Sequence, residues 1–461
     1  MKFLSEYSRW LSSFVYTASL LCVSTVFADS DDLTSTLLVE DYVSLSMPAE
    51  FHIESTELEG PVYADANGRT LYIWPYHGLR NGYSGERQGS PACYDEVLTI
   101  TAGLMSPYPP GILLPDLERR PSCTDLWPPV YANDHAEKIG KWTIINRKDG
   151  TRQWAYDEQP LYTSILDRKA GDVFGGSKHQ KDGADSPAYR TPVGPPAKVP
   201  PGFAVKTTSV GRLLTTNKNN SVYAFEGDTA DRSLCDARCM RHWKPVIAPA
   251  IARSQGEWTT LERSPGVWQW VFRGKPLYTY VLDQQSWSQE GSDISGWSNI
   301  YTQSSPRFPK SFTVQDTMAG QALANARGMT IYIYKCVDDS ADQLSCDHPN
   351  DTQVYRMAIC GAGDAEKCLR QWPYVEANEN ATSISRTWSV VRIDPKTGRI
   401  TTTEQKDALN VWAYRDRPVY TYSGDTQPGD VHGGGIGEVR GQRNGYRVLW
   451  LRDEYLGATL L

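Results

Sequence analysis

The sequence has little of what most enzymes and metalloproteins depend on. Its 461 residues include seven histidines, and none of them lies near another histidine at the spacing that metal sites use. It also lacks a Gly-x-Ser-x-Gly nucleophile turn, a Cys-x-x-Cys-His haem motif and a phosphate-binding glycine loop. These absences predict a protein that is not an enzyme and that binds no cofactor.

Positive charge is also scarce. The chain has 47 lysine and arginine residues against 54 aspartate and glutamate residues, a formal net charge of −7. A nucleic-acid-binding protein usually carries a basic stripe or patch, so the composition argues against a nucleic-acid partner.

The one long apolar run lies at the N-terminus. Lys2 and Arg9 precede a mostly apolar stretch from Leu11 to Phe27, which is typical of a signal peptide. We predict that residues 1–28 are removed by cleavage after Ala28; retention as an anchor is the alternative, although serine and threonine interrupt the run. No later stretch is long and apolar enough to cross a membrane. We therefore expect a mature chain without a transmembrane helix, exported to the periplasm or the extracellular space.

Aromatic residues and turn formers are, by contrast, abundant, with 15 tryptophans, 26 tyrosines, 37 glycines and 29 prolines. One pattern that contains them occurs three times without a gap, at Trp154–Asp167, Trp270–Asp283 and Trp412–Asp425. In each copy the tryptophan and the aromatic residue two positions later would share one face of a strand. Three mostly polar residues then make the reversal, and a proline opens the return strand. The pattern therefore predicts three β-hairpins.

Wider repetition sets the module boundaries, because a repeated unit is normally a folding unit. A Pro-x-x-Phe opening recurs at Pro48, Pro200 and Pro309, after a polar leader at residues 29–46 that we expect to be flexible. The predicted modules are residues 47–199 (module 1, which ends in a linker), residues 200–308 (module 2) and residues 309–461 (module 3). We expect an all-β fold of three tandem disulfide-stapled modules, each made of short antiparallel strands and hairpins. A single propeller-like ring of repeats is the alternative.

The cysteines support this organisation. Apart from Cys22 in the predicted signal peptide, eight remain, an even number that favours disulfides in an exported chain over metal ligands or catalytic thiols. Three of them belong to a Cys-x-x-x-Trp motif, and each has another cysteine upstream. The predicted pairs are Cys93 with Cys123, Cys235 with Cys239, Cys360 with Cys368, and Cys336 with Cys346. The four cysteines of module 3 alone allow three pairings, so this choice stays open there.

The signature Tyr-x-(Phe/Trp/Tyr)-x-x-Asp is complete at Tyr223–Asp228, Tyr278–Asp283 and Tyr420–Asp425. With the neighbouring Cys-x-x-x-Trp-Pro and Pro-Leu-Tyr-Thr elements, it resembles the bacterial secreted-repeat family, described as predicted lipoproteins of unknown function. The resemblance covers nearly the whole mature chain and implies a fold and export, but no activity. The chain departs from the family at the lipoprotein cysteine, because Leu21 stands before Cys22 where a small residue is required.

The repeated positions are expected to be structural, because the inner faces of strands must be buried. They are Trp154, Tyr162, Asp167, Trp270, Tyr278, Asp283, Trp412, Tyr420 and Asp425. An aspartate that follows a strand commonly accepts hydrogen bonds from the next turn. Calcium binding is the alternative, since calcium prefers carboxylate and carbonyl oxygens and the glycine-rich turns supply both. The candidates for such a metal site are Asp167 with Asp172, and Asp425 with Asp430.

These features together predict a non-enzymatic, exported scaffold or interaction protein of the envelope or periplasm. Its partner would be an envelope protein or a surface ligand that the sequence does not identify. One alternative is a carbohydrate- or small-ligand-binding protein that uses exposed aromatic side chains outside the repeat, with Trp287, Trp297 and Tyr301 as candidates. A second alternative is a redox-linked accessory protein that uses the closely spaced Cys235 and Cys239.

Overall fold

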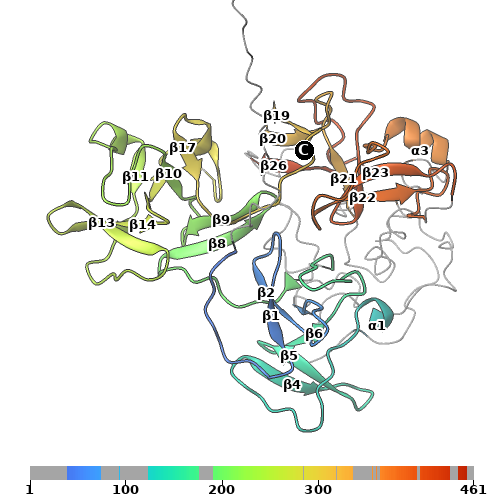
Figure 1. Cartoon of the computed structure of the whole chain (residues 1–461), viewed down its shortest axis with the longest axis horizontal. Helices are drawn as coiled ribbons and strands as arrows, with labels where there is room; N and C mark the ends of the chain where they lie inside the picture. Colours follow the sequence, from blue (N-terminus) through green and yellow to red (C-terminus); the bar gives the residue numbers. More distant parts are fainter. Residues whose placement is uncertain are drawn as a thin grey trace, which may run out of the picture. The chain divides into compact units, whose positions relative to one another are not determined.

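The computed structural model is mainly β-sheet, with 39% of residues in strands and 6% in helices, which confirms the all-β prediction (Figure 1). It describes residues 39–73, 93, 123–175, 191–283, 285–317, 319–335, 356, 360, 364–401, 405–436 and 445–453. The predicted signal peptide, most of the leader, and Cys336 and Cys346 lie outside these ranges. Within the described ranges, no helix has the length and apolar character needed to cross a membrane.

The strands of each sheet come from one predicted module. Module 1 contains β1 (His52–Ser55), β2 (Pro61–Ala64), β3 (Tyr72–Ile73), α1 (Cys123–Leu126), β4 (Trp142–Asn146), β5 (Arg152–Tyr156), β6 (Gln159–Tyr162) and β7 (Thr191–Pro192). Module 2 contains β8 (Phe203–Thr208), β9 (Gly211–Thr216), β10 (Tyr223–Phe225), η3 (Cys239–Arg241), β11 (Trp243–Pro245), β12 (Ile247–Ala248), β13 (Trp258–Ser264), β14 (Val267–Phe272), β15 (Lys275–Pro276), β16 (Tyr278–Tyr280), η4 (Glu290–Asp293), β17 (Trp297–Asn299) and β18 (Tyr301–Ser304). Module 3 contains β19 (Thr313–Thr317), β20 (Gly320–Ala324), β21 (Tyr332–Lys335), α3 (Ala365–Gln371), β22 (Trp388–Ile393), β23 (Leu409–Tyr414), β24 (Arg417–Tyr420), β25 (Gly445–Val448) and β26 (Trp450–Asp453).

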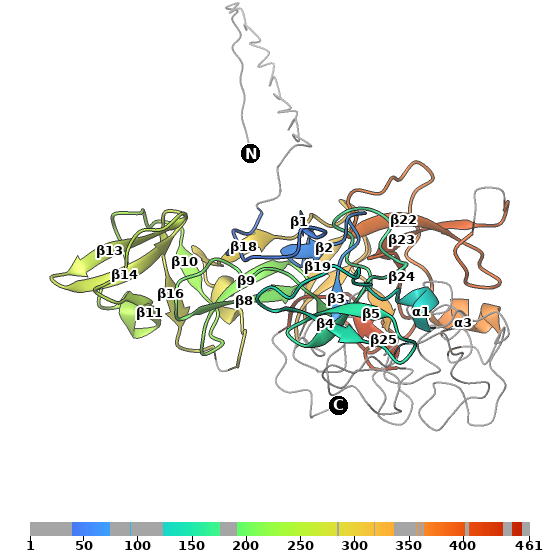
Figure 2. The ribbon, with the colours of Figure 1, turned by 90° about the horizontal axis from the view of Figure 1, so that it is seen from below.

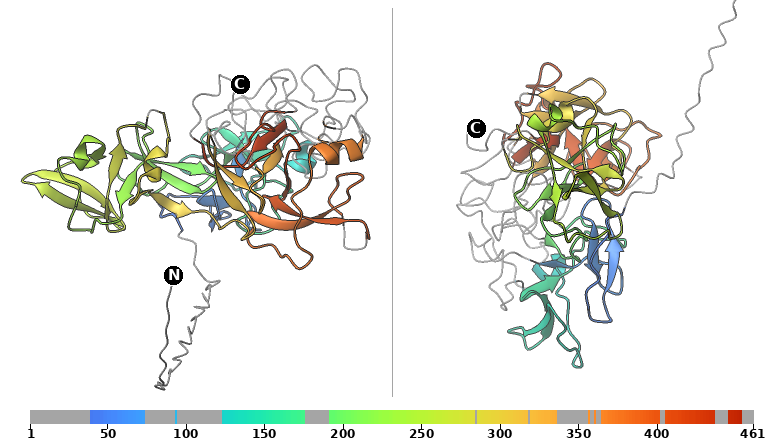
Figure 3. Two further views of the ribbon diagram at one scale, coloured as in Figure 1. Left: turned by 90° about the horizontal axis from the view of Figure 1, so that it is seen from above. Right: turned by 90° about the vertical axis from the view of Figure 1, so that its left-hand side faces the viewer.

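Modules 1 and 3 share one antiparallel sheet topology. Their five-stranded sheets have the orders β4-β5-β6-β3-β7 and β22-β23-β24-β21-β25. In module 2 the corresponding strands form two sheets, β12-β14-β13 with β15 beside β14, and β11-β16-β10-β17. The long β13–β14 hairpin extends from the rest of this module (Figures 2 and 3). Each module also starts with a two-stranded hairpin, β1–β2, β8–β9 or β19–β20.

The three repeated stretches form hairpins with a tighter reversal than the sequence suggested. Arg415 and Asp416 alone connect β23 to β24, and Tyr414 pairs with Arg417. Both turn residues have positive φ, 51° and 61°, which is the type I′ geometry that matches the twist of the flanking strands. Asp157–Glu158 and Arg273–Gly274 have the same geometry. The third polar residue therefore belongs to the return strand, and the proline is its second residue.

Each module's core begins at its Pro-x-x-Phe turn. The phenylalanine amide donates to the proline carbonyl at 3.1 Å in modules 1 and 2 and at 2.8 Å in module 3. In module 1 the Phe51 ring stacks on Trp142 at 4.7 Å and meets Trp154 edge-on at 5.8 Å. Phe203 and Phe312 contact the corresponding tryptophan pairs of modules 2 and 3. Because such rings bury large apolar areas, this turn fixes one end of each core.

The end of the leader is held in place, in contrast to the flexible segment that we expected. Glu40 is buried, and its carboxylate accepts hydrogen bonds from Arg212 Nη2 at 2.8 Å and from Arg212 Nε at 3.1 Å. A two-point arginine–carboxylate contact is strong and directional, so it holds Glu40 against Arg212 of β9.

Candidate functional site

The tyrosine and aspartate of the repeated signature are bonded to each other across two neighbouring strands. In module 2, β10 and β16 run antiparallel with Tyr223 opposite Tyr278. Tyr223 Oη donates to Asp283 Oδ2 at 2.8 Å, and Tyr278 Oη donates to Asp228 Oδ2 at 2.5 Å. Each tyrosine is therefore bonded to the aspartate of the other signature. We call this arrangement the crossed Tyr–Asp pair, and it gives a structural reason for the fixed spacing between the two residues.

Modules 1 and 3 keep one half of the crossed Tyr–Asp pair. The bonds join Tyr72 Oη to Asp167 Oδ2 and Tyr332 Oη to Asp425 Oδ2, each at 2.7 Å. The strands again place tyrosine opposite tyrosine, at Tyr72–Tyr162 and Tyr332–Tyr420. At the position that Asp228 occupies in module 2, the sequence has His77 in module 1 and Val337 in module 3; both lie outside the described residues.

The aspartates considered as calcium ligands accept hydrogen bonds from the glycine-rich turns that follow them. Asp167 Oδ1 accepts from Phe174 N at 2.8 Å, and Asp425 Oδ1 accepts from His432 N at 3.0 Å. Asp172 accepts the amides of Arg168 and Lys169, and Asp430 those of Thr426 and Gln427. These are the hydrogen bonds expected if the aspartates stabilise the turns that follow them. In the part of the chain that the structure describes, no cluster of three or more histidine, cysteine, aspartate or glutamate side chains is placed to hold a metal ion.

Burial changes the acidity of these groups. Removal from water raises the pKa of the Asp167 carboxyl to about 7 and also raises the pKa of the Asp425 carboxyl. Burial likewise raises the pKa of the Tyr72 and Tyr332 hydroxyls, which therefore stay protonated as donors. A carboxyl that titrates near neutrality can mark a catalytic group. Both oxygens of Asp167 accept hydrogen bonds, from Tyr72 and from Phe174 N. We therefore assign Asp167 a structural role, with a contribution to stability that depends on pH.

An arginine–glutamine pair holds the carbonyl of the upstream cysteine in modules 1 and 2; both side chains are buried in module 1, and in module 2 the arginine is half-buried. Arg263 Nη1 donates to Gln269 Oε1 at 2.7 Å, and its Nη2 donates to the Cys235 carbonyl at 2.6 Å. The corresponding contacts in module 1 join Arg147 to Gln153 at 2.7 Å and to the Cys93 carbonyl at 2.6 Å. The sequence analysis missed this pair. Its only signal is that the same arginine and glutamine recur at matched positions in two modules and are both absent from the third.

Module 3 has apolar side chains at the positions of the arginine and the glutamine. Ile393 and Val411 stand where the other modules have arginine and glutamine, and both are fully buried. A different arginine, Arg356, lies in this core: its Nη2 donates to Tyr374 Oη at 2.8 Å, and its guanidinium lies 4.6 Å above the Tyr420 ring. A polar pair and an apolar pair are thus two consistent ways to fill one site.

Exchanging the module 2 pair for the module 3 pair tests this interpretation. Arg263→Ile should cost about 2–3 kcal/mol of unfolding free energy, because it leaves the buried Gln269 side chain without its donor. Gln269→Val should cost about 1–2 kcal/mol, because it removes one acceptor from the half-buried Arg263, which keeps Ser233 Oγ as a partner. The double variant should cost at least about 1 kcal/mol less than the sum of the two, since it removes both partners. Denaturant unfolding of the four proteins measures this coupling, and strictly additive effects would show that the two side chains do not depend on each other.

The structure contains the disulfides Cys235–Cys239 and Cys360–Cys368, two of the predicted pairs. Cys93 is also disulfide-bonded; the side chain of Cys123, its predicted partner, lies outside the described part, as do Cys336 and Cys346. Each observed bridge is short-range and lies beside the tryptophan of its cysteine motif.

The three aromatic residues considered as ligand-stacking candidates, Trp287, Trp297 and Tyr301, each contact other side chains of the protein. Trp297 is buried and stacks face to face on Trp243, with ring centroids 3.5 Å apart, so its assignment as a stacking residue for a ligand is wrong. The Tyr301 hydroxyl donates to Gln289 Oε1 at 2.7 Å, and Lys206 Nζ lies 3.5 Å from the centre of the Trp287 ring. All three rings are engaged by the protein itself.

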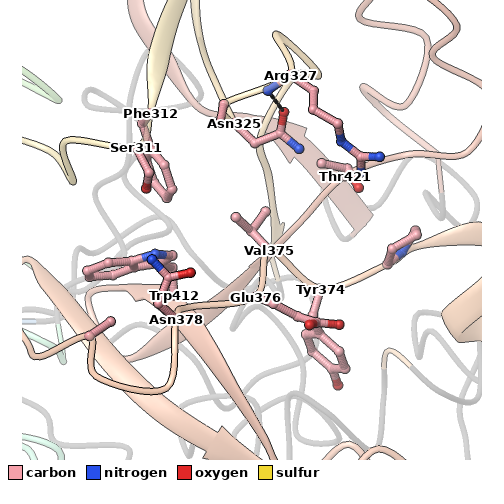
Figure 4. Close-up of a pocket in the computed structure, with 13 residues that line it drawn as sticks. Ser311, Phe312, Asn325, Arg327, Tyr374, Val375, Glu376, Asn378, Trp412 and Thr421 are labelled. Carbon is pink, nitrogen blue, oxygen red and sulfur yellow. Dashed lines mark hydrogen bonds between the residues drawn. The ribbon is translucent and has the colours of Figure 1, made fainter.

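A cavity of about 450 Å³ opens in module 3, between the Pro-x-x-Phe turn, the β20–β21 turn and the segment that follows Trp372. Figure 4 shows Ser311, Asn378 and Trp412 on one side of it and Arg327 on the other. Within the described residues, neither the indole N–H of Trp412 nor the side-chain amide of Asn378 has a hydrogen-bond partner. We refer to this cavity as the module 3 pocket.

Two regions of the chain match a known protein family. Residues 143–178 and 401–441 match a secreted repeat of unknown function, which confirms the resemblance to a secreted-repeat family in these regions. Both contain a repeated hairpin and the glycine-rich turn that Asp172 or Asp430 closes. No curated protein and no solved structure matches the chain. The match is consistent with an exported protein and carries no activity with it.

Proposed function

We propose, from the match to a secreted repeat, that this chain is an exported, non-enzymatic interaction protein of the periplasm or envelope. Its repeated hairpins serve as the framework, and a surface that differs between the modules binds the partner. The match to a secreted repeat supports export. The described residues contain no helix suited to crossing a membrane, which is compatible with this location.

One observation carries the proposal. The polar side chains of the repeated signature are bonded to each other, as in Tyr223 with Asp283 and Tyr278 with Asp228. The module 3 pocket has the opposite character, because Trp412 and Asn378 present donors that the described protein leaves open. Asn378 is exposed and the Trp412 side chain is largely buried, and a hollow lined by apolar side chains with a few polar groups is typical of a binding site. The framework thus explains the repeats, and the pocket offers the place for a ligand.

A capture experiment tests this proposal. The exported protein is immobilised and exposed to an envelope extract, with Asn378→Ala as the pocket variant and Asn380→Ala, an exposed neighbour, as the matched control. We expect a partner that is retained by the wild-type and control proteins and lost from the pocket variant. Equal retention by all three proteins would place the binding surface elsewhere.

The redox alternative makes a different prediction for Cys235 and Cys239. Cys235 is buried, and its carbonyl is held by Arg263, so we expect the bridge to resist mild reductant. Thiol counting with peptide mapping should find the two cysteines linked before and after treatment. Selective and reversible opening of this bridge in the native protein would favour a redox role instead.

A further inference from the structure

The three Pro-x-x-Phe turns place one variable residue at an equivalent position. The residue before the phenylalanine is Glu50 in module 1, Gly202 in module 2 and Ser311 in module 3. The turns are equivalent because each closes with the same phenylalanine-to-proline hydrogen bond and packs its ring on the same pair of tryptophans. The side chains at this position can therefore be compared directly among the three modules.

In module 1 this place is filled by a carboxylate. Glu50 Oε1 accepts a hydrogen bond from the indole N–H of Trp154, and Glu50 Oε2 accepts one from Asn133 Nδ2 at 3.3 Å. Trp154 belongs to the repeated hairpin, and Asn133 to the segment that follows the cysteine motif. An indole and an amide thus bind the two oxygens of one carboxylate.

Module 3 keeps both donors and lacks the carboxylate. Trp412 corresponds to Trp154: its main-chain amide donates to Val375 O at 2.9 Å, as that of Trp154 does to Val130 O at 2.8 Å. Asn378 lies six residues after the motif tryptophan, as Asn133 does. Ser311 stands in place of the glutamate, and its short side chain leaves the module 3 pocket where the carboxylate would be.

The charges around the pocket also differ from those in module 1. In module 1 the turn holds the ion pair Asp65–Arg69. Module 3 has the neutral Asn325 and Met329 at these positions and adds Arg327, so the turn beside the pocket changes from no net charge to one positive charge. Glu376 also lines the pocket, but Figure 4 shows its carboxylate extending away from Trp412. The side that carries the open donors is therefore free of acidic side chains and faces a guanidinium, which suits an anionic group.

Module 2 has neither the asparagine nor the glutamate. It has Pro249 where the other modules have the asparagine, and Gly202 where module 1 has the glutamate. Trp270 still packs on Phe203 there. The phenylalanine–tryptophan contact therefore forms in module 2 without the asparagine or the glutamate.

We propose that the module 3 pocket binds the carboxylate of an acidic side chain from a partner peptide, in the position that Glu50 occupies in module 1. The inference rests on the proposed interaction role and names the chemistry of the partner. A peptide is the favoured source because the group that fills the equivalent place in module 1 is itself a glutamate on a peptide turn. Trp412 and Asn378 bind the two oxygens, and Arg327 supplies the favourable charge.

The first test fills the pocket from within. Ser311→Glu should raise the melting temperature by about 2–4 °C relative to Ser311→Gln, because it restores the contacts of module 1 and adds about 1 kcal/mol. Ser311→Gln is the matched control of equal length without charge. A melting temperature for Ser311→Glu at or below that of Ser311→Gln would overturn the inference, whatever the protein's partner is.

The second test uses ligands. Protein labelled with 5-fluorotryptophan is titrated with N-acetylglutamate amide, with N-acetylglutamine amide as the uncharged control and galacturonate as a sugar acid. We expect the Trp412 signal, assigned by Trp412→Phe, to shift with the glutamate probe alone, and Asn378→Ala to weaken binding about tenfold. An equal response to the glutamine probe would overturn the carboxylate assignment, and a response to galacturonate alone would overturn the peptide source.

The two proposals fail in different ways. If Ser311→Glu stabilises the protein but no envelope partner is captured, the carboxylate site stands and the interaction role fails. If a partner is captured but binds equally to Asn378→Ala, the interaction role stands and this pocket is not its site.

Discussion

Tyr223→Phe combined with Tyr278→Phe is expected to destabilise module 2 by about 3–5 kcal/mol, because each change removes a hydrogen bond to a carboxylate inside the sheet. The two hydroxyls donate to Asp283 and Asp228 from opposite strands, so the double change removes one hydrogen bond from each aspartate. Hydrogen exchange of the β10 and β16 amides measures the effect directly. It should speed up by about two orders of magnitude or more, the rate equivalent of that free energy.

Tyr280→Phe is the matched control for this prediction. Tyr280 lies on the same strand, two residues after Tyr278, and its hydroxyl has no hydrogen-bond partner among the described residues. Its removal should cost less than about 0.5 kcal/mol. If the double variant exchanges no faster than this control, the crossed Tyr–Asp pair does not hold the module together, and another reason is needed for the signature.

Raising the pH from 4 to 7 is expected to lower the stability of module 1 through Asp167. Its carboxyl has a pKa of about 7 in the folded protein, against 3.8 in a solvated aspartate. Between these values the folded state holds the proton more tightly than the unfolded state, so unfolding becomes easier as the pH rises. The favourable contribution is complete below pH 4 and is lost once the pH has passed 7. The loss is on the order of 3 kcal/mol.

Asp167→Asn should remove this pH dependence, because the amide does not titrate. Asp149→Asn is the control: Asp149 is exposed and its pKa lies below the usual value, owing to hydrogen bonds from Thr151, so its ionisation is complete before the window opens. Thermal unfolding between pH 4 and pH 8 should give a falling curve for the wild type and the control, and a flatter one for Asp167→Asn. Parallel curves for all three proteins would contradict the assignment.

Much of the framework could be predicted because it depends on local sequence. Alternating aromatics, a proline after a polar turn and a tryptophan four residues after a cysteine each act over a few residues. The repeats revealed these patterns three times over. The predicted turn was one residue too long. The observed type I′ turn requires positive φ at Arg415 and Asp416, and the sequence Arg-Asp does not predict this conformation.

The contacts that define the Tyr–Asp pairs and the proposed site could not be predicted, because they join distant parts of the chain. Tyr223 reaches Asp283, and Tyr278 reaches Asp228, only because β10 and β16 pair in one particular register. Glu50 and Trp154 are bonded across more than a hundred residues, so their relation to Ser311 and Trp412 becomes visible only when the folded modules are compared. Trp297 was misjudged for a similar reason, since its stacking partner Trp243 lies on a different strand.

Site-specific photo-crosslinking in living cells tests the central claim most directly. A benzophenone amino acid is placed at residue 376, on the rim of the module 3 pocket, and separately at residue 131, the equivalent position in module 1, where Tyr131 is exposed. If the repeats are framework and the module 3 pocket binds the partner, only the probe at residue 376 should give a discrete crosslinked product, and Ser311→Glu should abolish it. A product of equal yield from residue 131, or one that persists with Ser311→Glu, would contradict the account.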